Sequence, residues 1–305
     1  MPLSLSTHWN AHRHASGETL IDEILELGLR HVELGYDLTV DLVPGVRQRV
    51  ESGAVRVTSV HNYCPVPMGA ARGHPELYLL ATRSARTRDS AIYHTQRTIE
   101  FAASLGAACV VAHGGYARLW PVTPRLIALA ADGRQHEPKF DRLKQKLLLK
   151  RDRKAAKDLE GLKAARGQLL PVLERNQVRL ALENLPAWEA VPNEAEMEQL
   201  GREFDSPWIG YWHDIGHGQV RENLGFISVL SWLQRLQTWL CGMHVHDVRA
   251  PAMDHLVPGA GTVNFPALRP FASPELPLVM EPAPGTPVAL VAAGLAALRD
   301  AWGMG

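Results

Sequence analysis

Short apolar runs recur along the chain, and six of them end at a residue that can bind a metal ion. These residues are His61, His113, Glu183, Asp214, His244 and Glu281, and His217 follows Asp214 by three positions. Buried parallel strands are near-continuous apolar runs, and ligands bind at their carboxyl ends. One such ending would mean little, because buried strands often finish on a polar residue. Six together predict parallel strands whose carboxyl ends surround one shared site.

Strand-like and helix-like segments alternate along the chain, which indicates a parallel sheet with helical crossovers. The expected strands are residues 3–7, 31–34, 55–60, 108–112, 178–182, 208–212, 240–243 and 278–280. The expected helices include residues 18–27, one ending near residue 53, and residues 90–105 and 287–299. An open sheet binds ligands only near its switch point, so six contributing strands favour a closed α/β barrel, a (β/α)8 TIM barrel. We expect one such domain over residues 1–305.

An oversized segment, residues 117–177, separates the fourth and fifth expected strands. Within it, residues 140–166 predict one long helix rich in Lys and Arg. Its basic face could contact a phosphate backbone. Acidic residues are interspersed among the cations, which is more typical of the solvated face of a packed helix. We therefore expect an enlarged helical segment with a solvated basic face.

Composition and charge limit the partners of this chain. Lys plus Arg and Asp plus Glu are both 32, so no global field attracts nucleic acid or an anionic membrane. The three cysteines are too few and too scattered for a disulfide framework. Neither a signal-peptide pattern nor an apolar segment of about 18 residues is present, so we expect a cytoplasmic protein. A homodimer is the ordinary assembly to expect.

The residue types at the strand ends are those of a transition-metal site. Carboxylates combined with imidazoles suit Zn, Mn, Fe or Co. Alternation along a strand places His244 and His246 on one side and Asp247 on the other. Two of these three could serve the site, and the third would orient a ligand or pack outward. Any one of these residues could be an ordinary core or loop residue, but their joint placement favours a site.

Seven motifs, in this order, carry a resemblance to a known family. They are HVELG at residues 31–35, VVAHGG at 110–115, LALEN at 180–184, DIGH at 214–217, HVHD at 244–247, DHLVPGAG at 254–261 and VMEP at 279–282. The chain resembles the xylose isomerase-like barrel superfamily over nearly its whole length. That superfamily includes sugar and sugar phosphate isomerases and epimerases, and also abasic-site endonucleases of the endonuclease IV type.

The resemblance implies a role for each matching residue. Glu183, Asp214, His244 and Glu281 match a four-ligand metal site, and the two glutamates match the pair that exchanges the substrate proton in the epimerases. His61 and His113, with Glu183, match a second metal site of the endonucleases. His217 and His255 match two of three ligands for a third ion. The remaining ligand, an aspartate, is replaced by Met253, and the chain therefore departs from a complete three-zinc centre.

Other residues are expected to contact a substrate. We predict substrate contacts from His217, Glu33 and Trp9. The Glu33 carboxylate could bind a site histidine or a substrate hydroxyl, or it could form a salt bridge inside the barrel mouth. Trp9, Tyr63, Tyr116 and Trp212 could form aromatic walls for a sugar, or they could be ordinary packing residues.

These expectations support three hypotheses. The first is a metal-dependent isomerase or epimerase of a carbohydrate (a sugar, sugar phosphate or related polyol), which holds one to two divalent ions and uses Glu183 and Glu281 as acid and base. The second is a zinc-dependent phosphoesterase of the endonuclease IV type, because His61 and His113 add ligands that a one-metal epimerase does not need. The third is a binding protein that kept the fold and lost the reaction. The number of bound metal ions separates the first two.

Overall fold

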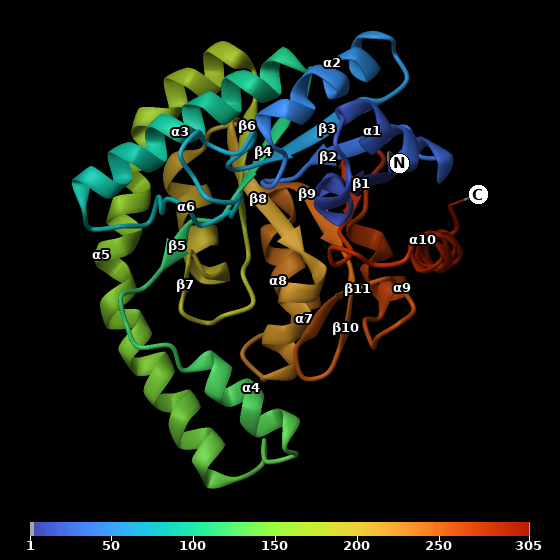
Figure 1. The fold of residues 1–305 in the computed structure, drawn as a ribbon. Helices are drawn as coiled ribbons and strands as arrows, with labels where there is room; N and C mark the ends of the chain where they lie inside the picture. Colours follow the sequence, from blue (N-terminus) through green and yellow to red (C-terminus); the bar gives the residue numbers. More distant parts are fainter. Residues whose placement is uncertain (1–2, 305) are drawn as a thin grey trace.

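Eight parallel strands close into a barrel within residues 3–304, the part of the chain that the computed structural model describes (Figure 1). Round the barrel the order is β1 (Leu3–Ser6), β12 (Leu278–Met280), β9 (Leu240–Val245), β8 (Ile209–Asp214), β6 (Arg179–Glu183), β4 (Cys109–Ala112), β3 (Arg56–His61) and β2 (His31–Leu34). Strand β1 pairs with both β12 and β2, which closes the ring. The predicted (β/α)8 barrel is therefore confirmed. Residues 1, 2 and 305, at the ends of the predicted domain, lie outside the described residues, and the single-domain division stays a prediction.

Side chains at alternate strand positions fill the inside of the barrel. One buried cluster there consists of Cys109, Val111, Ala181, Trp212, Cys241 and Val279. The Trp212 ring is fully buried, and Gly242 on the neighbouring strand leaves room for it, since a Cβ at position 242 would lie 2.2 Å from a ring carbon. The interior is thus a packed core rather than a channel, as in other barrels of this type. A substrate can reach only the ends of the strands.

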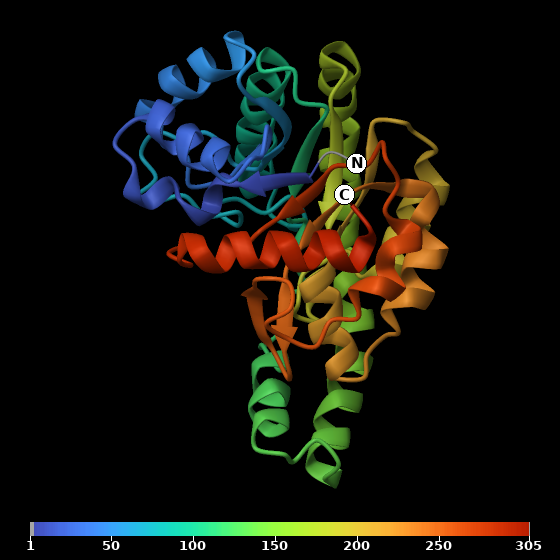
Figure 2. The same ribbon diagram turned by 90° about the vertical axis from the view of Figure 1, so that its right-hand side faces the viewer.

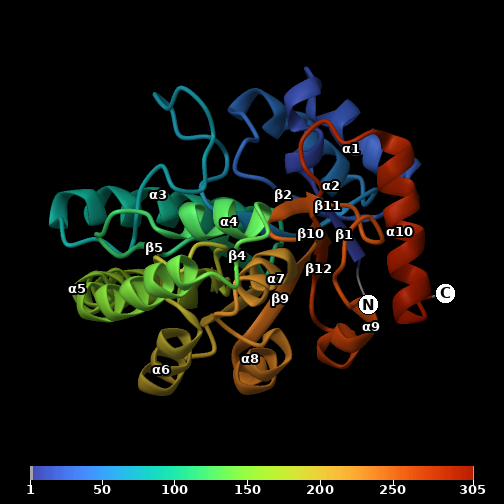
Figure 3. The same cartoon turned by 90° about the horizontal axis from the view of Figure 1, so that it is seen from below.

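Helices surround the barrel, as two further views show (Figures 2 and 3). They are α1 (Gly17–Glu26), α2 (Val43–Glu51), α3 (Ala85–Ser104), α6 (Glu194–Phe204), α7 (Ile215–Asn223), α8 (Val229–Leu236), α9 (Phe265–Leu268) and α10 (Val288–Trp302), with the 3-10 turns η1 (Thr7–Trp9), η2 (Ala11–Arg13), η3 (Val40–Leu42), η4 (Gln237–Trp239) and η5 (Arg269–Phe271). Side-chain caps begin several of them. The Ser16 and Ser84 side chains accept backbone N–H groups at the starts of α1 and α3. Within residues 3–304, none of the helices has the length and apolar character needed to cross a membrane.

The predicted enlarged segment forms an arm of two helices, α4 (Thr123–Ala131) and α5 (Pro138–Asn176). Both helices project beyond the barrel in Figures 1 and 2. A separate buried cluster holds the arm to the body and includes Leu126, Phe140, Leu147, Trp188 and Val220. The cations Lys139, Arg142, Lys146, Lys150, Arg153 and Lys157 are all exposed along α5. This arrangement is what the solvated-face interpretation predicts.

The structure corrects several predicted boundaries. The long helix extends to Asn176 instead of residue 166, because Pro171 is accommodated inside the helix and Leu169 and Leu173 pack in the core. Helix α3 begins at Ala85 instead of residue 90, because the Ser84 hydroxyl caps it. Strand β9 runs on to Val245, past the predicted end at residue 243.

Two short antiparallel sheets were not predicted. Strand β5 (Gly115–Tyr116) pairs with β7 (Ala190–Val191), and β10 (Asp247–Arg249) pairs with β11 (Met253–Leu256). Each strand has only two to four residues, which is too short to leave a clear pattern in the sequence. Both sheets follow carboxyl ends of barrel strands and therefore border the mouth of the barrel.

Candidate metal centre

The six strand-end residues continue the inward-facing alternation of the barrel core. Val111 is followed two positions later by His113, Ala181 by Glu183 and Trp212 by Asp214. A strand has a side-chain period of two, so these side chains point inward one layer above the packed interior. Figure 3 looks onto this end of the barrel from the side of the arm. The residues Glu183, Asp214 and His244 are nearly or fully buried there, at 3%, 0% and 0% exposure.

The first ligand group centres on Nδ1 of His244. This nitrogen lies 3.2 Å from Glu183 Oε1, 3.6 Å from Asp214 Oδ2 and 3.4 Å from Glu281 Oε2. Ligands about 2.1 Å from a tetrahedral zinc ion are separated from one another by about 3.4 Å. Atoms of Glu183, Asp214 and His244 also lie within 4.8 Å of one another. Glu183, Asp214 and His244 therefore have the spacing of ligands to one cation, and Glu281 approaches the same His244 nitrogen.

Glu33 fixes the orientation of His244. Its Oε1 lies 3.0 Å from His244 Nε2, and its Oε2 accepts a hydrogen bond of 2.7 Å from the Ser59 hydroxyl. A carboxylate can only accept, so Nε2 of His244 carries a proton, and in the neutral ring Nδ1 offers its lone pair to a cation. Of the alternatives for Glu33, the structure shows the contact with a site histidine. A substrate contact by this fully buried carboxylate would require that pair to open, and it stays a prediction.

The second ligand group shares Glu183 with the first. His61 Nε2 and His113 Nε2 each lie 3.3 Å from Glu183 Oε2, whereas His244 approaches Oε1. The His61 Nδ1–H donates to the Asn62 carbonyl at 2.9 Å, so the Nε2 lone pair of neutral His61 faces a carboxylate. That arrangement is repulsive unless a proton or a cation lies between the two atoms. The donor set of His61, His113 and Glu183 therefore fits a second ion, which these three residues would hold.

His113 is oriented by Glu76, a residue that the sequence did not indicate. Glu76 lies in the loop between β3 and α3, and its Oε1 is 3.2 Å from His113 Nδ1. The same oxygen accepts a hydrogen bond of 2.5 Å from the Tyr116 hydroxyl. Carboxylates commonly hold metal-binding histidines in this way. No periodicity or motif in that Pro-rich loop marks Glu76.

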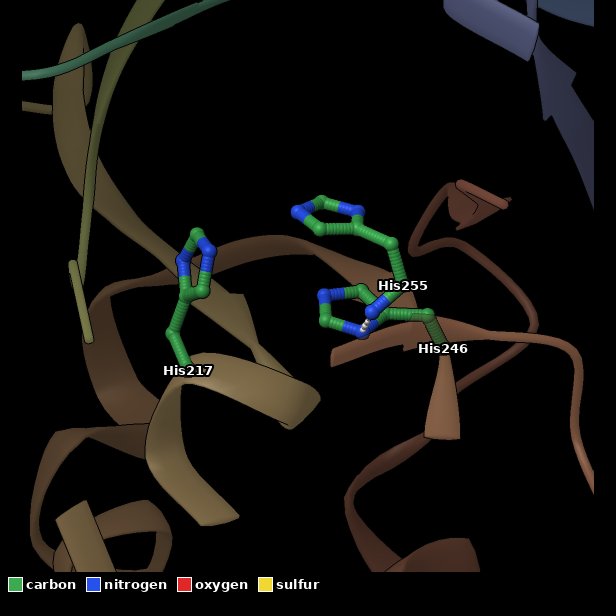
Figure 4. A group of neighbouring side chains, drawn as sticks. All are labelled: His217, His246 and His255. Atoms are coloured by element: carbon green, nitrogen blue, oxygen red, sulfur yellow. Dashed lines mark hydrogen bonds between the residues drawn. The ribbon is translucent and has the colours of Figure 1, made fainter. Parts of the chain in front are cut away.

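A third group consists of His217, His246 and His255 (Figure 4). The His217 Nδ1–H donates to the Asn184 carbonyl and the His255 Nδ1–H to the Glu281 carbonyl, at 3.0 and 3.1 Å, so in the neutral rings each Nε2 offers a lone pair. His246 differs, because its Nδ1 accepts the His255 backbone N–H at 2.9 Å and its Nε2 donates to Asp214 at 2.9 Å. His246 thus positions Asp214, and two free nitrogens remain in this group.

Neither Met253 nor Asp247 supplies a ligand to the third group. The Met253 side chain, at the position where the endonucleases carry an aspartate, is 56% exposed. Asp247 is the member of the HVHD motif that turns away from the site. Its carboxylate accepts the backbone N–H groups of Val248, Gly259, Gly261 and Val263, which ties the following loop together. The third group therefore lacks a carboxylate of its own.

The local folding of the DIGH motif places His217. Asp214 ends β8, and its Oδ1 accepts the His217 backbone N–H at 2.6 Å, which caps α7. Asn184 holds the same turn, since its Oδ1 accepts the Asp214 N–H at 2.8 Å. Gly216 is required by packing, because a Cβ there would lie 1.9 Å from the His246 ring. The motif thus combines a ligand, a helix cap and a close approach to a neighbouring histidine.

Charges in the site favour ionised carboxylates and raise the pKa of His113, His217 and His244, whereas burial and the neighbouring His246 lower the pKa of His255 to about 4. Burial raises the pKa of Glu183, but the His244 charge and hydrogen bonds from His113, His217 and His244 outweigh it and hold that pKa well below its usual range. Burial also opposes the shift at Glu281, whose pKa falls to about 2 beside His244 and His255. For His113 and His217, neighbouring carboxylates overcome burial and raise each pKa to about 9. Protons and a cation therefore compete for the same nitrogens.

The predicted aromatic residues differ in exposure. Trp9, Trp212 and Tyr63 are all buried, at 0%, 0% and 1%. The Trp9 Nε1–H donates to the Thr286 carbonyl at 2.7 Å and the Tyr63 hydroxyl to the Tyr78 carbonyl at 2.6 Å. These contacts are those of packing residues that support the wall of the mouth. Tyr116 is half-buried beside Glu76, and a substrate contact by Trp9 stays a prediction.

Comparison with protein families identifies the class to which this architecture belongs. The family described as "xylose isomerase-like TIM barrel" matches residues 21–273, and the chain belongs to that family. The resemblance drawn from the seven motifs is thus confirmed. Comparison with curated proteins gave no match.

Solved structures repeat the whole barrel. A putative xylose isomerase from Rhodospirillum rubrum has 16% identity and a TM-score of 0.71, over 98% of this chain and 99% of that one. The 3-keto-D-glucoside 4-epimerase YcjR from E. coli has 15% identity and a TM-score of 0.69, over 98% and 99%. The IOLI protein, with a bound zinc atom, has 13% identity and a TM-score of 0.68, over 99% and 98%. At these identities the likeness shows a shared fold.

Proposed function

We propose that the protein is a metal-dependent isomerase or epimerase of a sugar, sugar phosphate or related polyol. The observation that carries the proposal is the approach of Glu183 and Glu281 to a single His244 nitrogen, at 3.2 and 3.4 Å, from different strands. Two carboxylates beside one cation site could face a substrate carbon from two directions. The name of the E. coli neighbour, a 3-keto-D-glucoside 4-epimerase, is consistent with this chemistry.

The residues that would hold the cation are Glu183, Asp214, His244 and Glu281. A divalent ion there, Zn, Mn or Co, would act as a Lewis acid on a carbonyl and a neighbouring hydroxyl and favour an enediolate. The protein moves the protons: one glutamate removes a proton from carbon, and the other returns one. Of the two glutamates, Glu281 is the better candidate for removing the proton from carbon. Within residues 3–304 its side chain is paired only with His244 and His255, at 3.4 and 3.9 Å, whereas both oxygens of Glu183 are engaged.

Replacing Glu183 with Gln tests the proposal. We expect turnover of ketose and aldose substrates to be lost, because an amide cannot exchange a proton with carbon, while binding of a sugar remains measurable. Incorporation of deuterium from D2O into the carbon-bound positions of the sugars, followed by NMR, measures the chemical step. Glu51→Gln, at an exposed position on α2, is the matched control. Full activity in the Glu183 variant would end the assignment.

A specific observation supports a second candidate, a zinc-dependent phosphoesterase. His61 and His113 face the second oxygen of Glu183, which a one-metal epimerase does not require. Two ions bridged at about 3.5–4 Å could activate water and stabilise a leaving oxygen. The free Nε2 atoms of His217 and His255 would add a partial third position. Elemental analysis separates the candidates: two or three tightly bound zinc ions favour hydrolysis, and one exchangeable Mn or Co favours isomerisation.

We propose further that the enzyme acts in the cytoplasm as a homodimer on a small carbohydrate. The balanced net charge supports a small-molecule substrate over nucleic acid. Light scattering of the purified protein would test the dimer. A salt-sensitive gel shift with abasic DNA would argue for the phosphoesterase instead.

A further inference from the structure

Three residues at the ends of β1 and β2 form a hydrogen-bonded chain that none of the roles above uses. Asp37 Oδ2 lies 3.0 Å from His8 Nδ1, and His8 Nε2 lies 3.0 Å from the Tyr36 hydroxyl. The ionised Asp37 carboxylate can only accept, so Nδ1 of His8 carries a proton. Burial lowers the pKa of His8, but the hydrogen bond to Asp37 and the charges of Asp37, Glu281 and Glu33 together outweigh it and keep that pKa above the ordinary value. The protonated ring can then donate to Asp37 and Tyr36 together.

The backbone is built to bring these side chains together. A Cβ at Gly35 would lie 2.8 Å from Asp37 Oδ1 and 2.9 Å from the His8 backbone nitrogen, so only glycine permits this approach. The Gly35 N–H donates to the Thr7 hydroxyl at 2.8 Å, which locks the two strand ends side by side. The side chains of His8 and Asp37 are only 15% and 23% exposed. The chain of hydrogen bonds is therefore a shielded and supported arrangement, unlike a surface ion pair.

Tyr36, at the end of this series of hydrogen bonds, lies against the candidate metal centre. The Tyr36 ring stands edge-on to the His61 ring, with centroids 5.1 Å apart. It also packs against the His8 ring, with centroids 4.6 Å apart. A neutral tyrosine hydroxyl carries a proton to donate. The His61 ring that Tyr36 contacts lies 3.3 Å, through Nε2, from the Glu183 carboxylate.

We propose that Tyr36 is a catalytic residue that moves a proton on and off a substrate oxygen, with His8 as its proton source and Asp37 as the positioning residue. The inference rests on the proposed function, in which Glu183 and Glu281 move the protons bound to carbon. As a glutamate removes the carbon proton, negative charge develops on the former carbonyl oxygen. Tyr36 O–H gives its proton to that oxygen, and Nε2–H of His8 gives its proton to the Tyr36 oxygen. His8 becomes neutral, and the return path restores it, so no further reactant is needed.

The test compares Tyr36→Phe and His8→Ala with Tyr93→Phe, a change at an exposed tyrosine on α3. D-fructose, D-tagatose and their aldose isomers serve as substrates. General acid–base groups contribute about 10²–10⁴-fold, so we expect kcat of the Tyr36 and His8 variants to fall at least about 100-fold. Bound metal and KM should stay near wild-type values, and Tyr93→Phe should be unaffected. Phe keeps the packing of the ring against His61 and His8, which separates loss of the hydroxyl from loss of structure.

Two further readouts distinguish a relay from a structural role. The double variant Tyr36→Phe/His8→Ala should be no slower than Tyr36→Phe alone, because the groups act in series, whereas independent effects would multiply. Added imidazole should restore activity to His8→Ala but not to the double variant. Multiplying effects, or wild-type kcat in Tyr36→Phe, would overturn the proposal.

A binding measurement distinguishes failure of the proposed function from failure of the proton relay. Glycolohydroxamate, a planar mimic of an enediolate, should bind the wild type, and Tyr36→Phe should weaken binding at least about tenfold by removing a donor to its anionic oxygen. A wild type that neither turns over the sugars nor binds this mimic would remove the proposed function, and the relay with it. An active wild type with an equally active and equally tight-binding Tyr36→Phe would remove the relay alone.

Discussion

The His244 imidazole faces different partners with its two nitrogens. Nδ1 meets three carboxylates at 3.2–3.6 Å, and Nε2 meets the buried Glu33 carboxylate at 3.0 Å. Such pairing fixes the tautomer and raises the basicity of a ligand nitrogen. The Ser59 hydroxyl supports Glu33 from below. The capacity of this site for a cation would therefore depend on Glu33 as well as on the four proposed ligands.

Replacing Glu33 with Gln should weaken metal binding about 10–100-fold. Gln keeps the shape of the side chain but removes the charge that favours a proton on His244 Nε2. Competition with a chelating dye measures the dissociation constant for zinc. Glu51→Gln again provides the control at an exposed position. An unchanged dissociation constant would show that Glu33 only fills space.

A buried arginine adds a polar connection between helix α5 and the body, beside the apolar cluster described above. Arg151 is 1% exposed, contacts both oxygens of Glu196 at 2.5 and 2.6 Å, and donates to the carbonyls of Trp188 and Ala190. Glu196 also completes the capping box that begins α6 with Asn193. A single guanidinium thus connects the arm, the strand β7 region and the start of another helix.

Replacing Arg151 with Met should lower the free energy of unfolding by about 3–5 kcal/mol. The change leaves Glu196 and two carbonyls without their donor. Arg153→Met, two residues away at an exposed position, should cost less than about 0.5 kcal/mol. Urea denaturation of both variants measures the difference. Equal stabilities would mean that Arg151 contributes no more than a surface cation.

The sequence predicted the barrel because each strand leaves an apolar run and each site residue continues its inward alternation. The same rule applied to His8, which directly follows the first expected strand. The structure ends that strand at Ser6, one residue before its predicted end at residue 7, and Leu alternates with Ser along it, so its end was less distinct than the others. Glu76 leaves no signal, because it reaches His113 from an irregular loop. Contacts set by loop folding are not encoded in local periodicity, and these were the contacts that the sequence could not predict.

The whole molecule has equal numbers of Lys plus Arg and Asp plus Glu. Buried ionisable histidines and carboxylates are nevertheless gathered at one end of the barrel. His113 and His217 have each pKa raised to about 9 by neighbouring carboxylates, despite burial. A raised histidine pKa stabilises the folded metal-free protein fully below the unfolded value of about 6.5. That contribution is lost as the pH rises through about 9.

We therefore expect the metal-free protein to lose stability between pH 6.5 and pH 9. Cation binding displaces those protons, so the metal-loaded protein should lose less over the same range. The difference in melting temperature between zinc-loaded and chelator-treated protein should grow with pH. Calorimetry at pH 6.5, 7.5 and 8.5 measures it, with buffers matched in ionic strength. A difference that shrinks as the pH rises would contradict the assignment of these histidines.

Glu183 has one negative charge and offers one oxygen to each of two ligand groups. If both groups held ions, the first would draw on that charge and leave a poorer ligand for the second. Thermodynamic linkage would make that penalty mutual, so the second ion would bind more weakly whichever position filled first. The number of bound ions would then report how much metal is available around the protein.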